Sequence, residues 1–133
     1  MLTRFLGLIV LLAMVSQAAA ARYEVMIVTW RGCEEACLGF RAHLGERGLD
    51  VEVLLRDADQ DPTRLSGFLE EARTRQVDLI LSWGTSVTQG LAGTLQELGN
   101  PAYNHDIPQV FTIVADPVGA GLVRRWSAQV AAI

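Results

Sequence analysis

Small hydroxyl and glycine residues gather in the segment LSWGTSVTQG, residues 81–90, where an apolar run gives way to a helix-like pattern. A helix N-terminus presents unpaired N–H groups and about half a positive charge, which suits a carboxylate or another polar ligand oxygen. Ser82, Thr85 and Ser86 add hydroxyl groups, and Gly84 lets a ligand approach the backbone. Such a site would bind a ligand through hydrogen bonds and through the dipole of the helix.

The same residues also fit a purely structural role. Ser86 and Gln89 have the spacing of a capping box, in which side chains satisfy the first free amides of a helix. Trp83 either stacks on a ligand ring or packs within the protein. The residues alone leave both interpretations open.

Two further junctions between an apolar run and a polar turn carry candidate ligand contacts. Trp30 and Arg31 follow the first run, where an aromatic face and a fixed cation could hold a planar or carboxylated ligand. Alternatively, they form a turn before a helix, with Arg31 in solvent. Asp116 precedes Pro117 after the last run; it either accepts hydrogen bonds from a ligand or caps a final helix.

Enzymatic motifs are incomplete in this chain. The run from Gly84 to Thr88 is one residue short of the G-x-S-x-G elbow, and no histidine is a convincing partner for Ser86. Gly119 and Gly121 lack the third glycine of a dinucleotide fingerprint. All eleven basic residues are Arg, and a P-loop or a phosphoacceptor domain needs Lys. We therefore expect a protein that is not an enzyme and has no cofactor.

Cys33 and Cys37 are the two cysteines of the chain. Four-apart residues on a helix have Cβ atoms about 5–6 Å apart, beyond the usual disulfide span, so a bridge would need a distorted first turn. Their stripe with Phe40 and Leu44 favours two partly buried thiols over a bridge. Without third and fourth ligands they are a weak signal for zinc, and no metal site is expected.

Short apolar runs alternate with amphipathic segments along the chain, which predicts an α/β fold. Right-handed crossovers would make it an open doubly wound parallel sheet with strand order 2-1-3-4, in which ligands bind at the carboxyl ends of the strands. The expected strands are 23–28, 51–55, 78–81 and 109–114; the expected helices are 33–47, 61–75 and 87–98, with a possible last helix from about 118.

Residues 1–20 have the layout of a secretory signal: Arg4, an apolar run too short to span a bilayer, and a small-residue tail. We expect cleavage after Ala20, with Ala21 as the second choice and an uncleaved anchor helix as the alternative. Export places the protein in the periplasm, with no stable membrane insertion after cleavage. Losing Arg4 leaves ten Arg against fifteen acidic residues, so nucleic acid is a poor partner.

Three motifs together resemble a known family: Trp30-Arg31-Gly32, VDLILSWGTSVTQG and FTIVADPVGAGLV. From residue 23 to 123 the chain is similar to the TrpX-like periplasmic substrate-binding proteins of ABC transporters. The resemblance implies a type I periplasmic-binding-protein-like lobe that binds a small polar or aromatic solute and presents it to an ABC permease in the inner membrane. It also implies which residues line the crevice: Trp30, Ser82, Gly84, Thr85, Ser86 and Asp116.

The chain departs from this family after Val123. Members have two lobes and about twice this length, so residues 21–123 would be the N-terminal lobe and 124–133 a divergent tail. We expect a truncated protein that lacks its second lobe, binds its solute weakly and exposes an apolar patch. The alternative function is a ligand- or partner-binding sensory module associated with a signalling protein.

Overall fold

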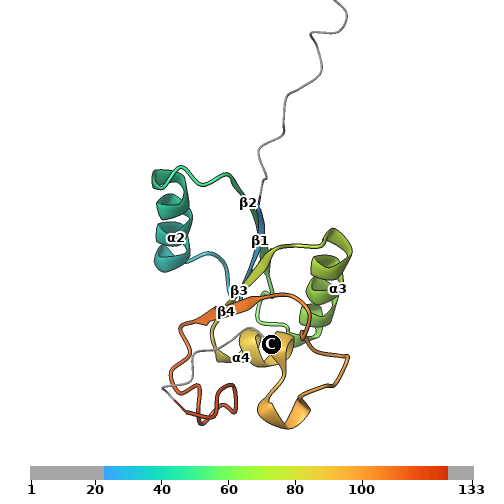
Figure 1. Ribbon diagram of the computed structural model, residues 1–133. Coiled ribbons are helices and arrows are strands. Elements are labelled where there is room, and N and C mark those ends of the chain that lie inside the picture. Colours follow the sequence, from blue (N-terminus) through green and yellow to red (C-terminus); the bar gives the residue numbers. More distant parts are fainter. Residues whose placement is uncertain (1–22, 126–133) are drawn as a thin grey trace, which may run out of the picture.

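The fold is a four-stranded parallel sheet with helices on both faces (Figure 1), and the computed structural model describes residues 23–125. The strand order is β2-β1-β3-β4, as predicted. The signal sequence expected at 1–20 and most of the tail expected at 124–133 lie outside the described residues. The strands are β1 (Tyr23–Thr29), β2 (Val51–Asp57), β3 (Leu79–Trp83) and β4 (Gln109–Thr112); the helices are α2 (Glu35–Glu46), α3 (Leu65–Arg75) and α4 (Thr85–Ala92), with short 3-10 helices at Pro62–Arg64 and Leu95–Glu97.

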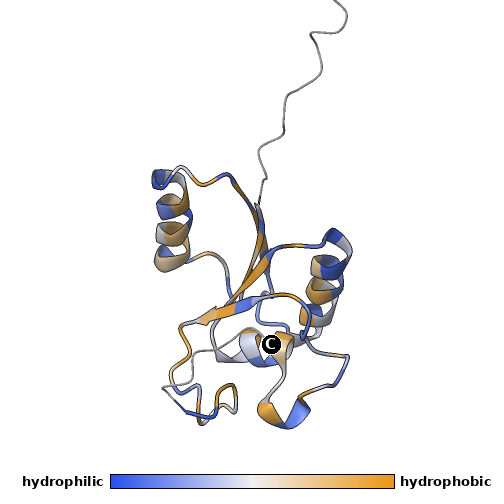
Figure 2. Ribbon diagram, viewed as in Figure 1, coloured by the Kyte–Doolittle hydropathy of each residue, from blue (hydrophilic) through white to orange (hydrophobic). Residues whose placement is uncertain are grey.

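The central strands are apolar on both faces because both faces are covered. In β1, Met26 and Val28 join the core beneath α3 and α4, whereas the alternating Val25 and Ile27 face α2. The hydropathy colouring of Figure 2 shows these strands as predominantly apolar and the C-terminal turns of α3 as polar.

The α3 segment matches its sequence pattern closely. The Asp61 carboxylate accepts a 2.9 Å hydrogen bond from the Thr63 N–H, and Pro62 opens the first turn, which is a 3-10 helix. Leu65, Leu69 and Ala72, which lie at helical spacing, are buried, and Phe68 packs against their cluster.

The predicted continuous helix over 87–98 is wrong. α4 ends at Ala92 because Gly93 adopts a positive φ of 71°, and its Cα lies against the Tyr103 ring, which a Cβ atom would meet at 2.9 Å. Thr94 then starts a 3-10 turn through a reciprocal capping box with Glu97. The leucines thus keep helical spacing beyond Gly93, although the backbone leaves the helix there, and this spacing misled the prediction.

The ends of β3 and β4 also differ from expectation. β3 runs two residues further, to Trp83, whereas β4 stops at Thr112 because Ile113 has a left-handed φ of 57°. The possible helix after Val118 is replaced by hydrogen-bonded turns over 117–122.

Cys33 and Cys37 form a disulfide with their Cα atoms 5.2 Å apart, so the expectation of two thiols is wrong. The cause is the helix boundary: α2 starts at Glu35, leaving Cys33 in the preceding turn, outside helical geometry. Of the twelve α2 residues only Cys37 is buried, whereas α3 buries three, so α2 is the more loosely packed helix.

Candidate functional site

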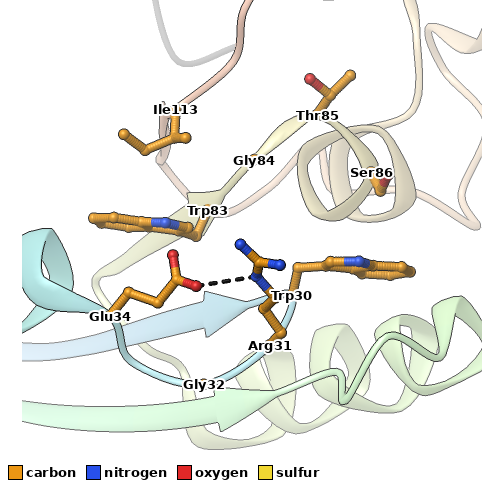
Figure 3. Close-up of a pocket in the computed structure, with 9 residues that line it drawn as sticks. All are labelled: Trp30, Arg31, Gly32, Glu34, Trp83, Gly84, Thr85, Ser86 and Ile113. Carbon is orange, nitrogen blue, oxygen red and sulfur yellow. Dashed lines mark hydrogen bonds and ion pairs between the residues drawn. The ribbon is translucent and has the colours of Figure 1, made fainter.

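A shallow hollow lies at the carboxyl ends of the strands, where the doubly wound fold places ligand sites (Figure 3). Its volume is about 230 Å³, enough to hold part of a small solute and below the usual range for a complete ligand pocket. Three segments converge there: the turn after β1, the β3–α4 junction, and the first residue after β4. The lining residues are Trp30, Arg31, Gly32, Glu34, Trp83, Gly84, Thr85, Ser86 and Ile113.

Two indoles and one guanidinium dominate the side-chain chemistry of the hollow. Figure 3 shows the Arg31 guanidinium between Trp30 and Trp83, and its Nε donates to the Glu34 carboxylate at 3.0 Å. This ion pair is exposed, with 68% and 55% of the two side chains accessible, so it is weak and a ligand anion can replace Glu34. Planar aromatic faces beside a cation whose anionic partner can be replaced suit a flat ligand that carries a carboxylate or another anionic group.

The first turn of α4 supplies free backbone donors. Gly84 is the N-cap with a φ of 89°, a conformation that favours glycine, and no side chain caps this end. The capping box suggested by Ser86 and Gln89 is absent at this end, because the Gln89 amide instead donates to the Ala120 carbonyl at 2.9 Å. Thr85 and Ser86, the first two residues of α4, therefore line the hollow at a helix end that has no side-chain cap.

Ser82 lies behind the hollow and is fully buried. Its hydroxyl is 3.0 Å from that of Thr88 and accepts a 3.1 Å bond from the Gln109 amide, so it joins β3 to α4 and β4. Direct ligand contact by Ser82 stays a prediction.

Asp116 is not among the lining residues. Its carboxylate accepts a 2.8 Å hydrogen bond from the Gly119 N–H, which is the capping role considered from the sequence, although in a turn and not a helix. The structure thus brings Trp30, Gly84, Thr85 and Ser86 together; a ligand role for Asp116 stays a prediction.

Asp57, at the end of β2, supports the hollow from behind and was missed from the sequence. Backbone N–H groups of Asp59 and then of Gly32 donate to its carboxylate and hold the pKa of Asp57 below its usual value. The bond from Gly32 fixes the turn that carries Arg31. The position of Asp57 at a strand end could have indicated this role.

Known structures show what this fold resembles. The chain is similar to three solved structures: a conserved domain protein from Vibrio cholerae (TM-score 0.64, 21% identity), a ligand-free, open substrate-binding protein with adhesive properties from Clostridium difficile (0.63, 23%), and an ABC domain in complex with L-Trp from Streptococcus pneumonia (0.59, 19%). The matches cover 77%, 77% and 76% of this chain and 34%, 34% and 33% of those chains.

What this chain shares with the three structures is the fold.

The chain spans about a third of the length of these structures. No protein-family model matches it. No curated protein sequence matches it significantly.

Two further features are absent from residues 23–125. That region does not gather three or more His, Cys, Asp or Glu side chains in a way that could hold a metal ion. None of its helices combines the length and apolar character that crossing a membrane requires.

Proposed function

We propose that this chain is the solute-binding lobe of an exported substrate-binding protein that serves an ABC permease in the inner membrane. The observation that carries the proposal is the convergence of a helix N-terminus without a side-chain cap, the exposed guanidinium of Arg31 and two indoles at the carboxyl edge of the sheet. These groups can bind a solute. The lining residues of the hollow include no nucleophile paired with a base, so they support binding and not catalysis. Export and the permease rest on the pattern of residues 1–20 and on the family resemblance.

The solute class follows from the lining chemistry. A carboxylate of the solute would take the place of Glu34 beside Arg31 and accept hydrogen bonds from the first amides of α4. A flat apolar part would lie against Trp83 or Trp30. An aromatic amino acid has both parts, and the L-Trp complex of one structural neighbour supports this choice.

Weak binding is expected from the described residues alone. Complete pockets enclose most of a ligand's surface, and this shallow hollow covers one side of it. We expect a dissociation constant for L-tryptophan on the order of 1 mM, equivalent to about −4 kcal/mol.

The test is a titration of the purified protein with L-tryptophan, followed by NMR chemical shifts of the two indole N–H groups at the hollow. Arg31→Gln should weaken binding about fivefold or more, because it removes the charge-assisted bond. Arg41→Gln is the matched control: Arg41 is also exposed, lies on α2 outside the hollow, and should leave binding unchanged. Absence of saturable shifts in the unsubstituted protein at 20 mM ligand, a level about twenty times the expected constant, would contradict the proposal.

A further inference from the structure

Ile113 has a backbone conformation that its residue type disfavours. Its φ is 57°, in the left-handed region, where a β-branched side chain is a genuine outlier. Its side chain remains 64% exposed, so burial in the core does not compensate. Conformational strain of this kind gathers at functional sites, where surrounding structure enforces it.

The surrounding structure here is the junction of β4 with α4. The Gly84 N–H donates a 2.9 Å hydrogen bond to the Thr112 carbonyl and fixes the end of β4 beside the start of α4. Ile113 follows at once, at the mouth of the hollow (Figure 3).

The left-handed turn decides which side of the sheet Ile113 occupies. Thr112 pairs with Trp83, and in a continued strand the next residue would point to the opposite face, toward α4. Instead Ile113 lines the hollow with Trp83 and also borders an adjoining depression formed with Glu34, Glu35 and Ala36 on the α2 side. The strained conformation therefore places an apolar side chain next to the Trp83 indole.

We propose that Ile113 is a specificity-determining residue, which together with Trp83 bounds a slot for the flat apolar part of the solute. This inference rests on the proposed function and adds to it the residue that separates aromatic from small amino acids. The carboxylate end is held elsewhere, at Arg31 and α4, so the two parts of the ligand are recognised by different groups.

Two substitutions separate the apolar contact from the conformation. Ile113→Gly removes both the side chain and the strain. Ile113→Asn removes the apolar surface but keeps a residue that tolerates the left-handed region, so the turn is retained. Gln76→Gly is the matched control: Gln76 also has a φ of 57°, but it ends α3, away from the hollow.

The measurements are thermal unfolding and titrations with L-tryptophan and L-alanine, which share the amino acid group and differ in the flat part. Ile113→Gly and Gln76→Gly should both raise Tm, by about 3–6 °C, because each relieves a left-handed residue. Both Ile113 variants should lose about fivefold or more in affinity for L-tryptophan and keep that for L-alanine. Gln76→Gly should keep both affinities.

The outcomes distinguish this inference from the proposed function. If the unsubstituted protein binds L-tryptophan and both Ile113 variants keep the original ratio of the two affinities, the role of Ile113 is overturned and the proposed function stands. If the unsubstituted protein binds neither amino acid, both proposals fail together. An Ile113→Gly variant with a lowered Tm would show that the conformation is not strained.

Discussion

The backbone N–H of Gly84 donates a 2.9 Å hydrogen bond to the carbonyl of Thr112, which ties the start of α4 to the end of β4. Both residues adjoin the hollow, so this bond fixes the relative position of two of its three walls. The left-handed φ of 89° at Gly84 allows the tight turn that makes the bond possible.

Gly84→Ala should therefore destabilise the protein by about 1–2 kcal/mol, measured by urea unfolding. A Cβ atom at this position would meet no heavy atom within 4 Å, so the cost is conformational and not steric. Gly39→Ala is the matched control, since Gly39 lies inside α2 with equally open surroundings and an unstrained φ. That control should stabilise the protein by about 0.5–1 kcal/mol. Equal effects of the two substitutions would contradict the explanation.

Reduction of the Cys33–Cys37 disulfide should release α2 before the rest of the protein. Because Cys37 is the only buried residue of α2, loss of the bridge loosens the start of the most weakly packed helix, and the chain-entropy relation for so short a loop gives about 2 kcal/mol. Hydrogen exchange should show α2 amides losing protection in reductant while α3 amides keep theirs. The Cys33→Ser/Cys37→Ser double variant should exchange its α2 amides as the reduced protein does, and adding reductant should not change that exchange. Uniform loss of protection in both helices would refute independent release.

Acid should weaken the turn that Asp57 supports. The pKa of Asp57 is lowered in the folded protein, so its contribution to stability is present above the unfolded pKa of about 3.9 and is lost as pH falls through the folded value. Asp57→Asn should cost on the order of 1 kcal/mol at pH 7, and this cost should shrink steadily as pH falls below about 4, measured by urea unfolding. A difference in unfolding free energy between the two proteins that stays constant as pH falls would show that the carboxylate charge is not responsible.

Val110 should promote self-association. It lies on the edge strand β4, on the face that α2 covers, opposite Leu81, and 52% of it is exposed. Exposed apolar residues on an edge strand are a ready contact surface. Val110→Asp should lower the apparent mass in sedimentation at high protein concentration, whereas Leu98→Asp, which changes a similarly exposed residue in the loop after α4, should not. A monomeric unsubstituted protein would rule out this contact.

The sheet was predictable because the same short sequence pattern, an apolar run followed by an amphipathic segment, recurs along the chain. Four apolar runs separated by amphipathic segments leave few alternatives once right-handed crossovers are required. The errors fall where one residue's backbone decides the outcome. Gly93 interrupts a leucine pattern that continues past it, and a shift of two residues at the start of α2 turns an unfavourable cysteine spacing into a bridge.

The candidate site was predictable in part for a related reason. Strand ends of a parallel sheet share one edge, so Trp30, Gly84, Thr85 and Ser86 could be brought together from the order of elements alone. Ile113 could not, because a β-branched residue in an apolar run predicts continued strand. The commitment of the Ser82 hydroxyl to Thr88 and Gln109 depends on packing between three elements, which spacing does not encode.

All four strands run the same way, so the lining of the hollow comes from the turn after β1, the β3–α4 junction and the residue after β4, while most core side chains lie deeper within strands and helices. Substitutions at the exposed lining residues Arg31, Ser86 and Ile113 would therefore change the surface of the hollow with little repacking of the interior. Under the proposed function, a few exchanges at this rim would be enough to change which solute is bound.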